Sequence, residues 1–272
     1  MSAASRESYA DASDKLTAFG AKATAAQLAT VADEILSVAA LLRAQPRLRR
    51  ALTDPARSGA DRADLLRSLL AGKLTQATVD TLATLVSGRF ARATELLDAV
   101  ERLGVETLLS SAERADTLAE VEDELFRFGH IVSGNAELAV TLSDPSASTD
   151  RQVKLVADLL KGKSQPATLR LVEVALEGFG GRSFESSLIR LVEMTAAKRD
   201  REVAYVTVAR PLTDADEQAL AAKLSDMYGR QVSLKVDVDP EVIGGVSVQV
   251  GSDLYDGTIL RRLTEARQAF AK

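Results

Sequence analysis

Apolar residues recur every three or four positions through the first 200 residues of the chain. The positions in the two clearest runs are Leu28, Val31, Ile35, Val38 and Leu42, and then Leu118, Val121 and Leu125. This spacing places apolar side chains on one face of an α-helix. The periodicity stops at the Asp-Pro pairs 54–55 and 144–145, because proline disfavours a helical residue before it. It resumes after Ser58 and Ser148, so the pattern predicts several short amphipathic helices.

The helical region contains an internal repeat. The segment 28–36 (LATVADEIL) aligns with the segment 118–126 (LAEVEDELF), a shift of 90 positions. The pairs that recur at this shift are Asp54-Pro55 with Asp144-Pro145 and Gly72-Lys73 with Gly162-Lys163, whereas Asp61-Arg62 matches Asp150-Arg151 at a shift of 89. Helical composition alone explains matching leucines, but it does not explain polar pairs in the same order. The repeat therefore predicts a duplication, with a junction near residues 104–114.

The pattern changes near residue 200. The expected elements are a strand over 203–209, a helix over 213–227 that Thr213 caps with Asp216 and Gly229 ends, a strand over 231–238, a strand at Val246, Val248 and Val250, and a helix over 257–271. The strand segments are rich in β-branched residues, and the third alternates apolar and polar residues as a half-buried strand does. This order predicts a small α/β domain.

The predicted fold class is mainly α, with two related helical bundles followed by a small α/β C-terminal domain. The predicted domains are residues 1–104, the first copy of the bundle, residues 105–200, the second copy, and residues 201–272, the α/β domain. A chain with 46% hydrophobic and 27% charged residues can bury such cores. With 4% aromatic residues and no Trp, the helices must pack chiefly through Leu, Ala and Val.

Composition excludes several classes of function. The 34 Lys and Arg residues and 39 Asp and Glu residues give a net charge of −5, whereas a nucleic-acid binder usually has a basic excess. The absence of Cys and the single His, His130, exclude disulfides, thiol nucleophiles and Cys-based zinc sites, and leave a Ser-His-Asp triad only if His130 supplies it. We therefore predict no catalytic, metal-binding or cofactor-binding residue. An enzyme that uses carboxylates or hydroxyls stays open in principle.

Four local features have a structural interpretation. Gly72-Lys73-Leu74-Thr75 and its repeat at 162–164 lack the first glycine of a phosphate loop, so we interpret them as helix C-caps. The segment 178–182 (GFGGR) follows a helix and lacks dinucleotide-binding spacing, so we interpret it as a turn. We interpret His130, which follows Phe126 and Phe128, as a partly buried packing residue. The acidic residues Glu120, Glu122, Asp123 and Glu124 are interpreted as a solvated helix face.

The N-terminus has no apolar stretch after a basic start, and the longest apolar runs, such as residues 38–42, are shorter than the roughly 18 residues that a spanning helix needs. We therefore expect a cytosolic chain, which can still join a membrane assembly.

The C-terminal third carries a specific resemblance. The residues that carry it are Asp239, Pro240, Gly244, Gly245, Gly251, Asp256, Arg262 and Leu263, and the opening 8–12 (SYADA) adds to it. Together they resemble the delta subunit of F-type ATP synthases, the oligomycin-sensitivity-conferring protein family. Thr258 stands where the family often has Ser. The helical part is duplicated, as in actinobacterial members, where most members have one copy.

The resemblance implies a non-catalytic stator subunit of a proton-translocating synthase, without cofactors. In this family, the subunit joins the alpha subunits of the catalytic head to the b subunit of the peripheral stalk, at the cytoplasmic side of the cell membrane. A helical adaptor of an unrelated soluble complex is the alternative. In this family, the two glycines are expected to serve the backbone conformation of a C-terminal domain that contacts the b subunit.

The resemblance also implies a groove between the first and fifth helices that receives an N-terminal segment of an alpha subunit. The candidate residues for this groove are Tyr9, Ala12, Leu16, Val79, Leu82, Ala83 and Val86. Bundle core is the alternative interpretation for each of them. The equivalent residues of the second copy are Leu169, Val172 and Leu176, and three roles stay open for that copy: a second alpha site, support for the first bundle, or contact with the stalk.

Overall fold

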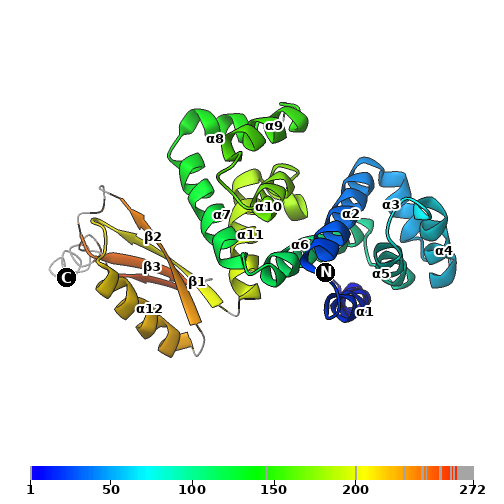
Figure 1. Ribbon diagram of the computed structural model, residues 1–272, viewed down its shortest axis with the longest axis horizontal. Helices are drawn as coiled ribbons and strands as arrows, with labels where there is room; N and C mark the ends of the chain where they lie inside the picture. The colour runs from blue at the N-terminus through cyan, green and yellow to red at the C-terminus, as the bar shows by residue number, and fades with distance from the viewer. Residues whose placement is uncertain are drawn as a thin grey trace, which may run out of the picture. The chain divides into compact units, whose positions relative to one another are not determined.

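The computed structural model describes residues 2–144, 146–199, 201–228, 231–239, 242, 244–250, 253–257, 259 and 261. They fall into two compact units, which divide between Leu191 and Val192 (Figure 1). The described residues are mostly helical, with a small sheet near the C-terminus. The predicted fold class is therefore confirmed.

The first unit is helical. Its elements are α1 (Ala3–Gly20), α2 (Ala25–Ala44), α3 (Pro46–Leu52), α4 (Gly59–Leu70), α5 (Gln76–Ser87), α6 (Ala93–Arg114), α7 (Leu118–Ser133), α8 (Ala136–Ser143), α9 (Thr149–Leu160), α10 (Pro166–Leu176), the short 3₁₀ turn η1 (Phe179–Gly181) and α11 (Phe184–Lys198), which crosses the division between the units. Ser and Thr residues cap several of these helices. The hydroxyls of Ser2, Thr24, Ser58 and Thr75 accept hydrogen bonds from amides in the first turn of the helix that follows.

The duplication is visible element by element, because α2–α5 recur as α7–α10. The helix after the first Asp-Pro pair begins at Gly59 and its counterpart begins at Thr149; likewise α5 begins at Gln76 and α10 at Pro166. Both shifts are 90 positions. The slip to 89 that the sequence alignment introduced near Asp61 is therefore wrong, and the structural partner of Arg62 is Gln152.

Helix α6 serves both copies. Its N-terminal half packs into the core of the first copy through Leu96, Ala99, Val100 and Leu103. Its C-terminal half, which leads into α7, buries a further set, Val105, Leu108, Leu109 and Ala112. The helix runs unbroken through Gly104, where an added Cβ would lie 2.7 Å from Leu36 Cδ2 on α2. The expected junction at 104–114 thus lies within α6, and the bounds 1–104 and 105–200 stay predictions about where the second copy starts.

Helix α2 is apolar on more than one face. Its length and mean hydropathy alone would allow it to cross a membrane, which is true of no other helix among the described residues. Eight of its residues are buried in the unit, among them Val31 and Ile35 in the core of the first copy and Ala32 and Leu36 on another side. A helix that is apolar all round is typical of one covered on several sides, and burial accounts for the composition of α2.

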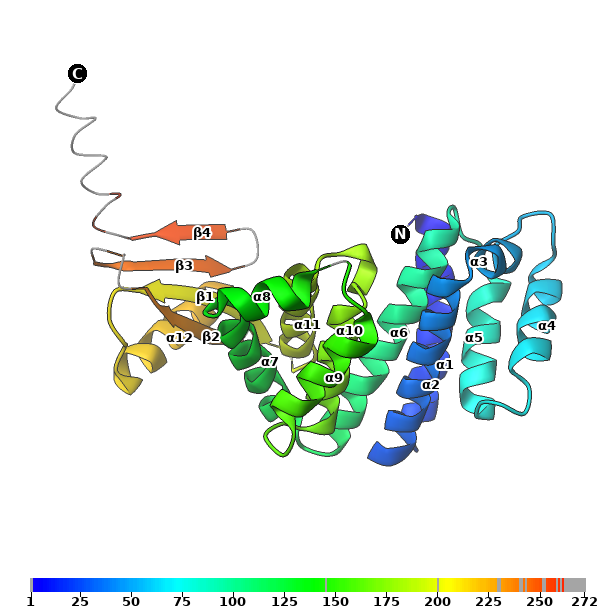
Figure 2. The same ribbon diagram turned by 90° about the horizontal axis from the view of Figure 1, so that it is seen from above.

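The described residues of the second unit form a mixed sheet and the helix α12, after the end of α11. Its elements are β1 (Arg201–Val208), α12 (Asp214–Tyr228), β2 (Gln231–Val238), β3 (Val246–Val250) and β4 (Asp253–Asp256), in the sheet order β2-β1-β3-β4. β1 and β2 are parallel and α12 is their crossover, whereas β3 pairs antiparallel with both β1 and β4 (Figure 2). The capping box predicted at Thr213 and Asp216 is present.

Two details of this unit differ from the expectation or lie beyond it. Strand β4 was not predicted from the sequence, because DLYD is a short segment that is polar at both ends and largely exposed. Of the helix expected over 257–271, the structure describes only residues 257, 259 and 261, and Gly229, the expected end of the preceding helix, also lies outside the described residues.

Candidate partner-binding surface

The seven predicted groove residues lie on α1 and α5, but beneath the surface. Their exposed fractions are 8% for Tyr9, 7% for Leu16, 6% for Val79 and at most 1% for Ala12, Leu82, Ala83 and Val86. All seven belong to the core of the first copy. We term the line of contact between α1 and α5 the first seam. Because the seven residues are buried, a partner that binds at the first seam contacts chiefly the residues around them.

Polar side chains cover the first seam. Lys15 Nζ on α1 donates to Thr84 Oγ1 on α5 at 3.4 Å, and Asp80, half-buried, accepts from Gln76. Asp11 is exposed. The surface is therefore a charged rim above an apolar interior, and it is not an open apolar groove.

The first seam is closed at one end by a close approach of the backbone. Ser8 Oγ accepts from the amide of Arg89 at 2.9 Å, and an added Cβ at Gly88 would clash with the same hydroxyl. Only glycine fits at position 88, so α1 and the end of α5 are fixed relative to each other.

Helix α1 is also tied to α6 near its middle. The Tyr9 hydroxyl donates to Glu106, and the Arg102 guanidinium lies 4.8 Å from the centre of the Tyr9 ring. Burial and the neighbouring Glu106 carboxylate raise the pKa of Tyr9. The tyrosine of the predicted opening segment is thus a structural anchor.

The start of α1 is tied to α6 through a buried carboxylate. Glu95 accepts from Ser5 Oγ at 2.5 Å, from Ser2 Oγ at 3.1 Å and from the Ser2 amide at 3.3 Å. Chiefly because of the Ser5 hydroxyl, the pKa of Glu95 is lowered to about 2. Glu95 is therefore ionised at neutral pH and holds the α1 N-terminus in place.

The two copies meet at an ionic network that sequence reasoning missed. Arg43 on α2 pairs with Glu101 on α6 at 2.7 Å and with Glu177 at the end of α10, and Glu101 also accepts from the Gly180 amide at 2.7 Å. Glu101 is 2% exposed, and its burial raises its pKa against the opposing effects of the Gly180 amide and Arg43. The contacts join residues 58 to 134 positions apart, so no local pattern identifies them.

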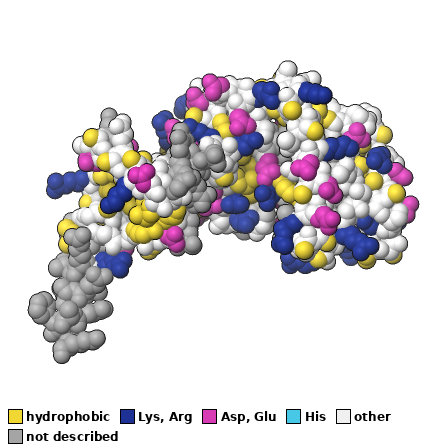
Figure 3. Space-filling view, turned by 90° about the horizontal axis from the view of Figure 1, so that it is seen from below, with side chains coloured by type: hydrophobic (Ala, Val, Ile, Leu, Met, Phe, Trp, Pro, Cys, Tyr) yellow, Lys and Arg dark blue, Asp and Glu magenta, His cyan; other side chains and the backbone are white. Residues whose placement is uncertain are grey.

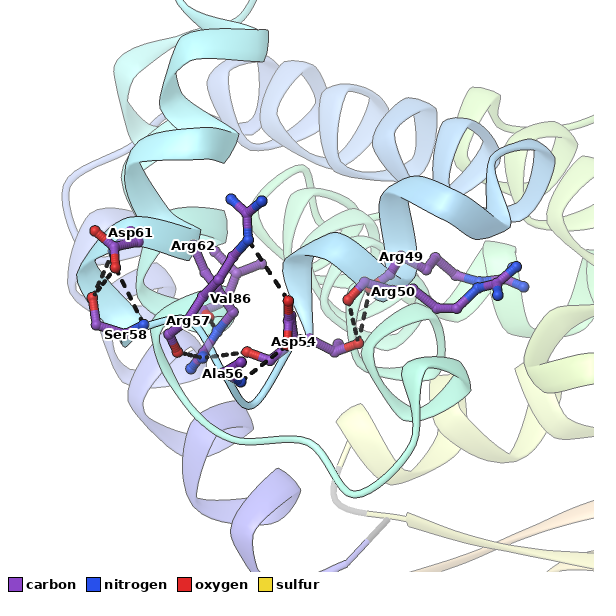
Figure 4. Close-up of polar contacts among 10 residues, drawn as sticks. Arg49, Arg50, Asp54, Ala56, Arg57, Ser58, Asp61, Arg62 and Val86 are labelled. Carbon is purple, nitrogen blue, oxygen red and sulfur yellow. Dashed lines mark hydrogen bonds and ion pairs between the residues drawn. The ribbon is translucent and has the colours of Figure 1, made fainter.

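Figure 4 shows a second polar centre, around Arg62 at the start of α4. Its buried guanidinium donates to the carbonyls of Asp54, Arg57 and Val86 (Figure 4). It also donates to the carbonyls of Ser87 and Gly88. In the second copy, the buried Gln152 amide donates to the carbonyls of Thr141, Leu142 and Asp144. Arg62 thus satisfies carbonyls of the Asp-Pro segment and of the C-terminal end of α5, and Gln152 satisfies carbonyls at the C-terminal end of α8 and that of Asp144. Both side chains are therefore structural.

The locally interpreted motifs are confirmed, with one exception. Gly72 and Gly162 follow α4 and α9 with φ of +71° and +68°, as helix C-caps do, and Gly178 begins a tight turn with φ of +81°. His130 is half-buried against Phe126, with the ring centroids 5.0 Å apart.

The exception is the acidic segment of α7, which is not wholly a solvated face. Glu122 is fully buried, because it lies on the same side of the helix as Val121 and Leu125. Glu124 is half-buried and accepts from the Gln165 amide at 2.8 Å and from Thr168 Oγ1 at 2.5 Å. The interpretation as a solvated face is wrong for these two residues.

The glycine pair of the signature has a backbone role. Gly244 and Gly245 have φ of +151° and +89°, and an added Cβ at Gly244 would lie 2.8 Å from Ile259 Cδ1. The amide of Ile259 also donates to the Gly244 carbonyl at 2.9 Å. The signature residues Pro240, Gly251, Arg262 and Leu263 lie outside the described residues.

The two remaining described signature residues, Asp239 and Asp256, lie at the ends of strands. The Asp239 amide donates to the Val208 carbonyl at 2.9 Å, which closes the end of the β1–β2 pair, and Asp256 pairs with Ser247 across β3 and β4. Apolar side chains are exposed in the same unit, and Figure 3 shows a gathering of them there. Those with the largest exposed fractions are Leu254 at 61%, Met227 at 54% and Tyr255 at 43%.

The surfaces of the two units differ in the kinds of side chain that they expose. Within the described ranges, no three or more His, Cys, Asp or Glu residues are grouped so that they could hold a metal ion. On the face in Figure 3, acidic and basic side chains are interspersed over the helical unit. The arrangement offers a mixed-charge surface on the helices and an apolar one on the α/β unit.

The chain is similar to known proteins along its whole length. The sequence profile of the family described as ATP synthase delta (OSCP) subunit matches residues 7–107 and again residues 105–270. ATP synthase subunit delta of Salinispora arenicola is 59% identical over 272 residues, which cover 100% of this chain and 99% of that protein. ATP synthase subunit delta of Streptomyces griseus is 43% identical over 271 residues, with both chains covered in full. The two matched segments meet inside α6.

Proposed function

Because the chain belongs to the ATP synthase delta (OSCP) subunit family, we propose that it is a non-catalytic stator subunit of an F-type ATP synthase. It joins the catalytic head to the peripheral stalk at the cytoplasmic side of the membrane, so that torque from the rotor drives ATP synthesis and does not turn the head. The observation that carries this proposal is the similarity to delta subunits along the whole chain, through both helical copies and the α/β unit.

The fold suits a part that transmits force. The first copy is held by a tight glycine contact at residue 88, by the carboxylate of Glu95 and by the polar centre at Arg62. Each ties together elements that are distant in sequence, and dense packing resists deformation. The chain itself needs no bound cofactor for this role.

The first seam is our proposed site for the N-terminal segment of an alpha subunit, which lies along the seam as a helix. The seven candidate residues supply the apolar interior under the seam. The segment meets a rim that includes Asp11, Lys15 and Asp80, so it needs complementary charges beside a narrow apolar stripe.

The α/β unit is our proposed site for the b subunit of the stalk. Its exposed apolar side chains, Leu254 and Tyr255 on β4 and Met227 on α12, are of the kind that protein interfaces bury. Separate sites for alpha and b would allow both contacts at once, and two linked contacts bind more tightly than either alone.

The test is an affinity pull-down with the tagged full chain from detergent-solubilised membranes of its source. We expect alpha, beta and b subunits to be retained in near-stoichiometric amounts, as measured by mass spectrometry. A Leu254→Asp variant should retain alpha and lose most of b, because it puts a charge into the proposed b surface. Retention of unrelated soluble proteins without synthase subunits contradicts the proposal and supports the adaptor alternative.

A further inference from the structure

The second copy contains a counterpart of the first seam. Helix α10 corresponds to α5 at the constant shift of 90 positions, and α6 leads into α7 as α1 leads into α2. The line of contact between α6 and α10, which we term the second seam, is therefore equivalent to the first seam. If the duplication had also duplicated the binding site, a second partner helix would lie here.

Helix α2 of the first copy lies along the second seam. Asp33 on α2 pairs with Arg170 on α10 at 3.1 Å, and ten residues later Arg43 pairs with Glu177 at the end of α10. The order of these contacts shows that α2 and α10 run in the same direction. On the α6 side, Leu36 packs on Gly104, and Arg43 pairs with the buried Glu101. Helix α2 is thus fixed to both helices of the second seam.

The sequence of α2 is suited to this position. Ala25, Ala29, Ala32 and Leu36 form a stripe at helical spacing beside the stripe that enters the core of the first copy. Ala25 and Ala29 line a cavity with α6 and α10, and Ala32 and Leu36 are buried. The helix contains only three ionisable residues, and two of them, Asp33 and Arg43, make the pairs described above. Its counterpart α7 is rich in acidic residues.

The open space that remains at the second seam has α2 as one of its walls. It is a pocket lined by residues of α2, α6 and α10, among them Ala29 and Asp33 of α2. A partner helix laid along α6 and α10 needs a channel about 10 Å across, and α2, which forms ion pairs with residues of both helices, lies in its path. A partner helix would have to displace α2 from its ionic contacts and from the core of its own bundle.

We infer that α2 permanently occupies the second seam, so that the second copy braces the first and the chain receives one alpha-subunit segment, not two. This inference rests on the proposed function for the identity of the partner, whereas the position of α2 is independent of it. The residues at the equivalent rim positions differ in charge, since Arg170 of the second seam corresponds to Asp80 of the first. The occupant of the first seam should therefore carry a basic residue where α2 carries Asp33.

The first arm of the test is calorimetric titration of the full chain with a synthetic peptide of the N-terminal segment of the alpha subunit of the same synthase. We expect one peptide per chain. The charge reversals Asp80→Lys and Arg170→Asp form a matched pair at equivalent positions. Asp80→Lys should weaken binding about tenfold, because it opposes a basic residue of the peptide, and Arg170→Asp should change neither affinity nor stoichiometry. Two peptides per chain, or loss of one site in Arg170→Asp, would overturn the inference.

The second arm does not depend on the peptide. Because the chain contains no cysteine, the variant Asp33→Cys with Arg170→Cys can be joined by a short bismaleimide. We expect rapid crosslinking within one chain and unchanged peptide binding afterwards. A pair that does not crosslink shows that α2 is not held on the second seam, and crosslinking that removes a peptide site also contradicts the inference. Rapid crosslinking in a chain that binds no peptide supports the position of α2 and contradicts the alpha site of the proposed function.

Discussion

The two helical copies share their framework and differ on the surfaces that face other helices. Both copies have a Ser before the helix that follows the Asp-Pro pair and a left-handed glycine after that helix. Both use a glutamate on the second helix to hold the start of the fifth, Glu34 in one and Glu124 in the other. These features fix turns and helix ends, where few residue types satisfy the backbone. The two copies therefore share the residues that satisfy backbone groups at turns and helix ends.

The differences lie where the copies meet other elements. Helix α2 has a second apolar stripe and few charges, since it is covered by its own bundle and by the second seam, whereas α7 is rich in acidic residues. The rim charge at Asp80 is replaced by Arg170. A duplicated domain can thus change from receiving a partner to supporting its neighbour without a change in its helix arrangement.

The largest expected difference between the copies is at Arg62 and Gln152. Replacing Arg62 with Met removes five hydrogen bonds to backbone carbonyls, and replacing Gln152 with Leu removes three. Buried acceptors left without donors cost about 1–3 kcal/mol each before relaxation. We expect Arg62→Met to lower the free energy of unfolding by roughly 4 kcal/mol and Gln152→Leu by about half as much, as measured by urea denaturation.

The conservative variant Arg62→Lys sharpens this prediction. A lysine carries the same charge but cannot reach carbonyls on both sides of the loop in a planar arrangement, so it should restore little of the loss. Full recovery by Lys would show that charge alone matters at this position. Equal losses at Arg62 and Gln152 would show that the second copy depends on this centre as much as the first does.

Much of the fold could be predicted from the sequence, because the signals were local. The helices, the duplication, the strands β1 to β3 and the glycine turns follow from spacing and from Asp-Pro and glycine positions. The shared helix α6 could not be predicted, since periodicity shows that a residue is buried but does not identify the partner that buries it.

The same limit applies to the candidate surface. The family resemblance placed Tyr9, Leu82 and Val86 on facing helices, and their spacing fits a groove. The same spacing also describes a core, and their exposed fractions show that they lie in one. The pairing of Arg43 with Glu101 and Glu177 joins three distant segments and has no local signature. The buried position of Glu122 was not predicted. Helical spacing does not distinguish a charged residue on a buried face from one on a solvated face unless the neighbouring helices are known.

The pH dependence of stability should differ between two carboxylates of α6. The pKa of Glu95 is lowered from 4.5 to about 2, so the stability that it contributes is present above pH 4.5 and is lost as pH falls from 4.5 towards 2. The pKa of Glu101 is raised by burial, so its contribution has the opposite sign and decreases as pH rises above 4.5. We expect Glu95→Gln to cost about 1–3 kcal/mol at pH 7 and much less near pH 2.

The measurement is urea denaturation of the parent, Glu95→Gln and Glu101→Gln between pH 2 and pH 7. The difference between the parent and Glu95→Gln should grow with pH, and that between the parent and Glu101→Gln should shrink. A difference for Glu95→Gln that does not change with pH would mean that its carboxylate is not held ionised by Ser2 and Ser5.

The smallest expected effect tests the part of the framework that both copies keep. Glu34 accepts from the Thr75 amide and from the hydroxyls of Thr75 and Thr78, and Glu124 accepts from the Gln165 amide and the Thr168 hydroxyl. Both carboxylates are partly exposed, so Glu34→Ala and Glu124→Ala should each cost only about 0.5–1.5 kcal/mol.

Since both glutamates hold the start of a fifth helix, amide hydrogen exchange should quicken at the first turn of α5 in Glu34→Ala and at the first turn of α10 in Glu124→Ala. The other copy should be unaffected in each variant. Because α10 is also fixed to α2 through Arg170 and Glu177, the increase in exchange should spread less far along α10 than along α5. Equal spreading in both helices would show that the ionic contacts with α2 add nothing to the stability of the second copy.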